Sequence, residues 1–134
     1  MKTSRFVSTT ISALCAISLA ASLAAAELTA NDKQFLANYE KVRAALAADN
    51  LDAAKQAAGE LGEQGTAIAK SDKIADARKD FEKLSDQAIQ LSKGHDGYYV
   101  ANCPMLKKDW VQTSKEISNP YAGKSMLTCG VIKK

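Results

Sequence analysis

The chain has 134 residues, with 18 Lys and Arg side chains against 15 Asp and Glu and a net charge of +3. This near balance excludes the strongly basic surface typical of nucleic-acid binding, and the length suits one domain with a modest core. His95 is the single histidine, and no nucleophile has an evident base and orienting partner, so we expect a protein that is not an enzyme.

The first 26 residues have the features of a secretory signal peptide. Lys2 and Arg5 precede an apolar run, and Ala24 and Ala26 give the small-x-small pattern after which signal peptidase cuts. Serines and threonines interrupt the run, which argues against a permanent membrane anchor. We therefore expect a periplasmic or secreted protein that begins at Glu27 and has no membrane span after cleavage. Loss of the two basic residues of the leader lowers the net charge from +3 to +1.

Residues 27–94 are predicted to form a mainly α domain, a three-helix up-down bundle. In each of three segments, apolar residues recur three or four positions apart, which is the period of one helix face. The expected helices are residues 32–48 capped by Asn31, a helix capped by Asn50 that ends or bends at Gly62 or Gly65, and a helix from Ser71 or Asp72 to Gly94.

Residues 95–134 differ in composition, and we expect an irregular tail that packs on the bundle as part of the same domain. Residues 98–101 are β-prone, and residues 126–131 are expected to return beside them as a short β-hairpin. This pairing would bring Cys129 towards Cys103. Trp110, Val111 and Ile117 are expected to cover the open end of the bundle.

The sulfur of the mature chain lies entirely in this tail, in Cys103, Met105, Met126 and Cys129. Thiolates and thioethers are soft donors that favour Cu(I), and Ag(I) suits the same donors, whereas structural zinc sites use Cys and His. His95 is a fifth candidate ligand. Residues 103 and 105 share a face only in extended backbone, whereas residues 126 and 129 share one only outside a regular strand.

A disulfide between Cys103 and Cys129 is the alternative that the same residues allow. Two cysteines in an exported protein usually form a bridge, which here would stabilise the fold by about 3 kcal/mol on the chain-entropy model. The protein would then be a structural or interaction module without a metal. The two hypotheses are compatible if the redox state of the pair decides its capacity for metal.

The motifs "YYVANCPM", "KEISNPYAGKSM" and "MLTCG", with Trp110 between the first two, resemble the end of a small periplasmic domain family of unknown function. Its members occur alone or fused to the periplasmic adaptor subunits of copper/silver-type heavy-metal efflux pumps. The segments "ANYEKVRAALAADNLDAAKQAA" and "RKDFEKLSDQAI" extend the resemblance over nearly all of the mature chain.

This chain departs from the family pattern at Asp80, where members often have His, and at Ala122, where many have an aromatic residue. The segment between Met105 and Trp110 is also shorter than usual. The resemblance implies a domain that buffers Cu(I) or Ag(I), or that passes the ion to an efflux adaptor or another periplasmic metal protein.

Overall fold

The computed structural model describes residues 26–133, so the expected signal peptide lies, apart from Ala26, outside the described residues. The elements in chain order are α1 (Ala30–Ala47), α2 (Leu51–Gly59), the 3₁₀ helix η1 (Gly62–Gly65), α3 (Thr66–Ala69), α4 (Ile74–Ser92), β1 (Tyr99–Cys103), β2 (Lys108–Gln112), the 3₁₀ helix η2 (Gly123–Met126) and β3 (Val131–Ile132). The expectation of a mainly α fold is confirmed, with a small three-stranded sheet added.

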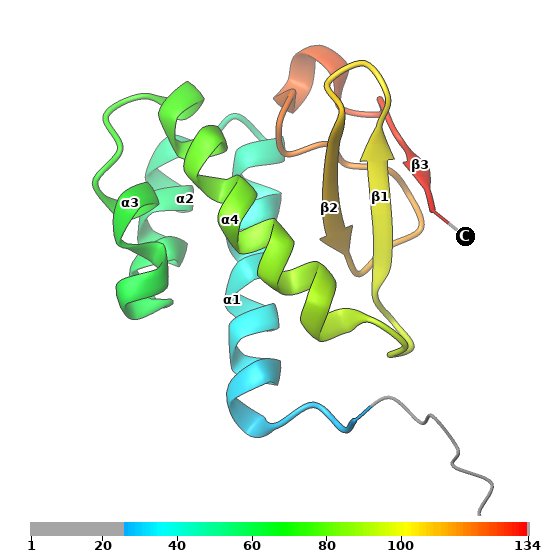
Figure 1. Cartoon of the computed structure of the whole chain (residues 1–134). Coiled ribbons are helices and arrows are strands. Elements are labelled where there is room, and N and C mark those ends of the chain that lie inside the picture. The colour runs from blue at the N-terminus through cyan, green and yellow to red at the C-terminus, as the bar shows by residue number, and fades with distance from the viewer. Residues whose placement is uncertain (1–25, 134) are drawn as a thin grey trace, which may run out of the picture.

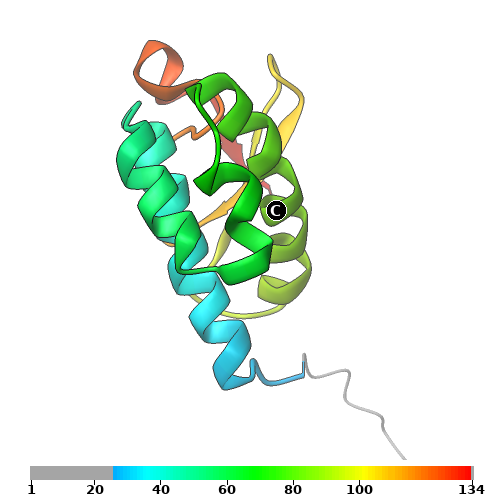
Figure 2. The ribbon, with the colours of Figure 1, turned by 90° about the vertical axis from the view of Figure 1, so that its left-hand side faces the viewer.

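The elements form layers that Figure 1 shows from the side. The pair α1 and α4 lies between α2 and α3 on one side and the sheet on the other. After a turn of 90°, the helices lie in front of the strands (Figure 2). Helix α4 packs on β2, and α1 contacts both α2 and α4. The two long helices therefore support the sheet directly.

The helix boundaries follow local capping chemistry. Thr29 caps α1, because its hydroxyl accepts from the Asp32 N–H at 3.1 Å while the Asp32 carboxylate accepts from the Thr29 N–H at 2.9 Å. The prediction of Asn31 as the cap is therefore wrong, and this reciprocal pair, a capping box, starts the helix two residues earlier. Asn50 caps α2 as predicted, accepting from Ala53 N–H at 3.0 Å.

The other two predicted boundaries shift by a few residues. Helix α2 ends at Gly59, and η1 follows at Gly62–Gly65 after a two-residue turn. Helix α4 begins at Ile74 after Lys73, so neither Ser71 nor Asp72 caps it. Ser71 instead donates its hydroxyl to the Ala67 carbonyl at 3.0 Å, which closes α3.

A single apolar core joins the helices to one face of the sheet. Tyr39 of α1 stacks on Phe81 of α4 with ring centroids 5.1 Å apart, and Val111 of β2 belongs to the same buried cluster. The buried Tyr39 hydroxyl contacts Ser85 at 3.1 Å and accepts from the Val111 N–H at 3.1 Å. Burial raises the pKa of Tyr39, so this hydroxyl stays protonated. It ties α1 to both α4 and β2.

The antiparallel sheet has the strand order β2-β1-β3. The tail does return beside β1, but the paired residues are Val131 and Ile132, opposite Asn102 and Ala101, and not residues 126–131 opposite residues 98–101. Met126 lies in η2 and not in a strand. The hairpin partner of β1 is instead β2, a strand that the sequence did not indicate. Because neighbouring strand residues face opposite sides, Val111 packs on the helices, whereas Trp110 forms a second cluster with Ala101 and Cys103.

Candidate functional site

The two cysteines of the described chain meet where β1 and β3 pair. Cys103 is the last residue of β1, and Cys129 lies two residues before β3; the pairing of Asn102 with Val131 brings them together. Their sulfur atoms are 2.8 Å apart, and no bond joins them in this structure. A disulfide bond is about 2.0 Å long, and two thiolates at about 2.3 Å from one tetrahedral metal are about 3.8 Å apart. Small displacements therefore reach either arrangement.

The turn between β1 and β2 surrounds the Cys103 sulfur with donors. Burial raises the pKa of this thiol, but hydrogen bonds from Cys129, from the backbone N–H groups of Leu106 and Met105, and from the Asn119 side chain outweigh it, so the pKa lies below its ordinary value. The hydrogen bond with Cys103 in turn raises the pKa of Cys129. In the reduced pair, Cys103 is thus the sulfur that loses its proton more readily, and Cys129 is the one that keeps it. Thiolates are both the nucleophilic and the metal-binding form of cysteine.

Asn119 holds the segment that carries Cys129. It is fully buried, and its side-chain N–H donates to the Cys129 carbonyl at 2.9 Å. Its side-chain oxygen accepts from the N–H groups of Tyr121 at 2.9 Å and Ala122 at 3.2 Å. The expectations drawn from the sequence did not include this role. The signal was present, because asparagine side chains commonly bond the backbone two residues ahead in turns.

Trp110 forms the floor under the sulfur pair. It is fully buried against Ala101 and Cys103, and its indole N–H donates to Gln112 at 2.9 Å. A Cβ on Gly130 would lie 2.8 Å from the indole ring, so the backbone beside Cys129 approaches the ring as closely as glycine allows. The expectation that Trp110 covers the end of the bundle is therefore wrong, because it faces the other side of the sheet.

Arg78 of α4 anchors the middle of the tail to the helices. Its guanidinium donates to the carbonyls of Pro120 and Leu46, both at 2.8 Å, and to the Asp49 carboxylate at 2.5 Å. Hydrogen bonds from Arg78 and from the Lys124 N–H lower the pKa of Asp49. These bonds fix η2 and the turn before it, and so set where Cys129 begins its approach to Cys103.

Gly123 is the position at which η2 comes closest to this anchor. Its φ of +60° is rare for other residues, and a Cβ would collide with the Asp49 carboxylate and the Arg78 guanidinium. The Gly123 N–H donates to the Asn119 carbonyl at 3.1 Å. The glycine of the Asn-Pro-Tyr-x-Gly motif therefore joins the Arg78 anchor to the Asn119 turn.

Each methionine can share a metal site with its neighbouring cysteine only in a particular backbone geometry, and only one of the two geometries is found. The condition that Met126 and Cys129 leave strand geometry is met, because Met126 ends η2 and its carbonyl accepts from the Cys129 N–H at 3.0 Å. The extended Cys-Pro-Met backbone is not found, because residues 104–107 form a turn in which Lys107 has a φ of +53°. The Met105 side chain is 74% exposed on this turn.

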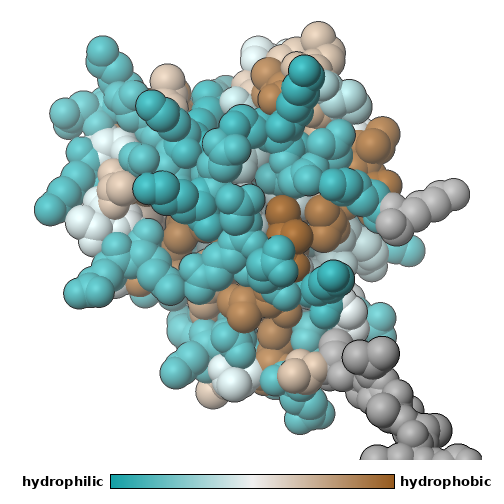
Figure 3. Space-filling view, viewed as in Figure 1, coloured by the Kyte–Doolittle hydropathy of each residue, from teal (hydrophilic) through white to brown (hydrophobic). Residues whose placement is uncertain are grey.

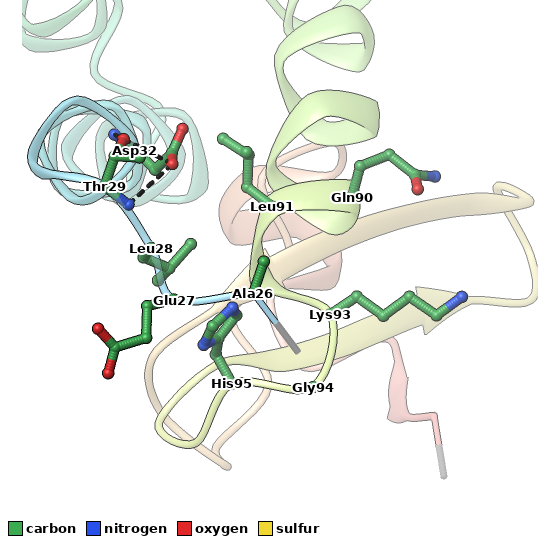
Figure 4. Close-up of a pocket in the computed structure, with 10 residues that line it drawn as sticks. All are labelled: Ala26, Glu27, Leu28, Thr29, Asp32, Gln90, Leu91, Lys93, Gly94 and His95. Carbon is green, nitrogen blue, oxygen red and sulfur yellow. Dashed lines mark hydrogen bonds between the residues drawn. The ribbon is translucent and has the colours of Figure 1, made fainter. Parts of the chain in front are cut away.

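The structure places His95 away from the sulfur pair. It lies beyond the end of α4, in a pocket that it shares with the segment before α1, and Figure 4 shows its ring beside Ala26. The strand β1 begins at Tyr99 and ends at Cys103, which separates the two sites by about 13 Å of extended chain. His95 is therefore not among the residues that the fold brings to the cysteines.

The surface adds two facts within residues 26–133. The face shown in Figure 3 is mostly hydrophilic, with apolar areas scattered between polar side chains. The exposed large apolar residues are Met105, Leu127 and Val131, all on the segments that carry the cysteines.

Within residues 26–133, no three His, Cys, Asp or Glu side chains form a metal-binding group, and no helix has the length and apolar character to cross a membrane.

Comparison with known proteins finds no family model, no curated protein and no solved structure that matches this chain.

Proposed function

We propose that this protein is an exported domain that binds Cu(I) or Ag(I) through Cys103 and Cys129 and buffers the ion or passes it to a metal-efflux component. The observation that carries the proposal is the 2.8 Å approach of the two sulfur atoms, with backbone N–H donors directed at one of them. Hydrogen bonds to a ligand sulfur are the usual support of a metal-bound thiolate. The export signal and the motif resemblance favour a periplasmic location and an efflux adaptor as partner.

The donor set suits a soft monovalent ion better than zinc. Two thiolates and a thioether are soft ligands, whereas zinc sites complete their four ligands with histidine or carboxylate, and none of these joins the pair among the described residues. Met105 is the thioether nearest in sequence to Cys103, and its exposed side chain is free to turn towards the pair. In this proposal α1, α2 and α4 are an up-down bundle that carries the sulfur-bearing tail on one side.

Competitive titration with Cu(I) tests the proposal. Reduced protein of residues 27–134 is titrated without oxygen against a chromogenic Cu(I) chelator, and we expect one ion bound per chain. The variants Cys103→Ser and Cys129→Ser should lose this binding. Met105→Leu and Met126→Leu identify the third ligand, because loss of the thioether that takes part should weaken binding, whereas loss of the other should not.

His95→Ala is the matched control, and it should leave the affinity unchanged. An unchanged affinity in the variant that carries all four sulfur substitutions would refute the metal proposal. The quadruple variant must be shown to fold, which far-UV circular dichroism can establish.

A structural module with a Cys103–Cys129 disulfide is the second candidate. The full burial of Cys103 and its contact with the Cys129 sulfur favour it. Mass spectrometry of the exported protein after thiol labelling separates the two functions. A bridge that is fully formed and resists reductant under native conditions supports the structural module, whereas two labelled thiols support the metal site.

A further inference from the structure

The two sulfur atoms of the pair differ in access. Cys103 has no exposed surface, since it lies in the cluster formed with Ala101 and Trp110. Cys129 is partly exposed, and it follows an exposed turn at Leu127 and Thr128. A dissolved thiol or disulfide can therefore reach Cys129 in the folded protein, whereas Cys103 is reached only by Cys129.

The two sulfurs also differ in how the fold holds them. Cys103 is the last residue of β1, whereas Cys129 lies in the segment between η2 and β3. Their sulfur atoms are 2.8 Å apart. When an external sulfur is bound to Cys129, the Cys103 sulfur is therefore placed to displace it.

We propose that the pair exchanges with low-molecular-weight thiols and disulfides always through the same sulfur, with Cys129 as the sulfur that forms the mixed disulfide and Cys103 as the resolving sulfur. On reduction, an external thiolate attacks the Cys129 sulfur, the Cys103–Cys129 bond breaks, and its electron pair leaves on Cys103. A second external thiolate then attacks the external sulfur of the mixed disulfide and releases Cys129. On oxidation by an external disulfide, the same steps run in reverse, and two external thiols are released.

The substrate class follows from the approach to Cys129. Its sulfur is reached over the exposed turn that precedes it, so a small flexible thiol such as glutathione suffices. The exchange needs no metal, so this proposal does not depend on whether the protein binds Cu(I). If Cu(I) also binds, oxidation by this route would remove both thiolate ligands in one reaction.

Single-cysteine variants give the first test, with metal-free protein and oxidised glutathione. Folded Cys103→Ser should accumulate one glutathione adduct, detected by intact mass spectrometry. Folded Cys129→Ser should react at least about 10-fold more slowly, because its remaining sulfur is buried. The double serine variant is the control and should not react. Equal rates in the two folded single variants, or a faster reaction of Cys129→Ser, would overturn the proposal.

The unaltered protein gives a second test that does not depend on the folding of any variant. The oxidised protein is mixed with reduced glutathione, quenched with acid during the reaction, alkylated and digested. Glutathione should be found on the peptide that contains Cys129, with the alkylating group on Cys103. Glutathione on Cys103 in this map would refute the assignment, whatever the outcome of the copper titration.

Discussion

The helical half and the sulfur-bearing tail of this protein are held together by different forces. In the helices, aromatic and aliphatic side chains such as Tyr39 and Phe81 form a large buried cluster. In the tail, the buried apolar cluster has three members, and the chain path is fixed by polar side chains that bond backbone groups, chiefly Asn119 and Arg78. The comparison teaches that a short segment can be placed accurately without a large core when a helical scaffold supplies the polar anchors.

The two regions also differ in how much free energy of unfolding is lost when a contact is disturbed. A helix core of many apolar contacts tolerates small shifts at a modest cost. A buried amide or guanidinium that loses its partner costs about 1–3 kcal/mol at once. The tail is thus the more sensitive region per contact, and it is the region that holds the cysteines.

Replacing Trp110 by alanine should have the largest effect on the tail. The change removes the floor of the small cluster, so we expect a loss of about 3–5 kcal/mol in the free energy of unfolding. Urea unfolding followed by circular dichroism measures it, with the protein reduced. Labelling of Cys103 should also become faster, because its cover is gone.

Phe81→Ala is the matched change in the helical core. It should cost a similar free energy by weakening the packing between α1 and α4. If Trp110→Ala costs less than about 1 kcal/mol, the small cluster does not hold the tail, and the contrast between the two regions fails.

Replacing Arg78 by glutamine should have an intermediate effect. The guanidinium makes three bonds that join α1, α4 and the tail, and it is mostly buried, so we expect a loss of about 2 kcal/mol. The denaturant midpoint of the reduced protein measures it. Lys79→Gln, on the exposed surface of the same helix, should change stability by less than about 0.5 kcal/mol. Equal effects of the two substitutions would show that Arg78 is not an anchor.

The ion pair between Lys108 and Glu82 should contribute least. Its atoms are 2.6 Å apart, but the side chains are 34% and 45% exposed, so water and salt screen it. We expect Glu82→Gln to cost less than about 1 kcal/mol. Urea unfolding in low and high salt measures the difference in the free energy of unfolding between the unaltered protein and Glu82→Gln, which should shrink as salt increases. A larger, salt-independent loss would mean that a surface charge pair helps to hold the hairpin on α4.

The sequence predicted the long elements better than the connections between them. The apolar period predicted α4 and most of α1, because many turns of helix repeat the same signal. Helix α3 and η1 have four residues each, too few to show a period. The strand β2 was missed because Trp110 and Val111 are both buried, on opposite faces of the sheet, which removes the alternation of a strand with one exposed face.

The sequence indicated the two cysteines of the site better than it indicated the residues that hold them in place. Export and soft-donor chemistry singled out the two cysteines, and the guessed return of the tail brought them together. The positions of Met105 and His95 depended on a turn and on a helix end, which the spacing of residues does not determine. Asn119 and Arg78 act by bonding backbone carbonyls in distant segments. The pattern of side chains along the sequence does not show which carbonyls the fold brings close to them.

The Tyr39 hydroxyl has a consequence for how the folded protein behaves at high concentration. The unpaired edge of a sheet can recruit a strand from another molecule and start aggregation. The outward N–H of Val111 on β2 is already occupied by Tyr39, and α4 packs on the same strand. At the opposite edge, β3 is only two residues long, too short to template a long ladder. The hydrogen bond between Tyr39 and Val111 therefore also hinders the pairing of β2 with a strand of another molecule.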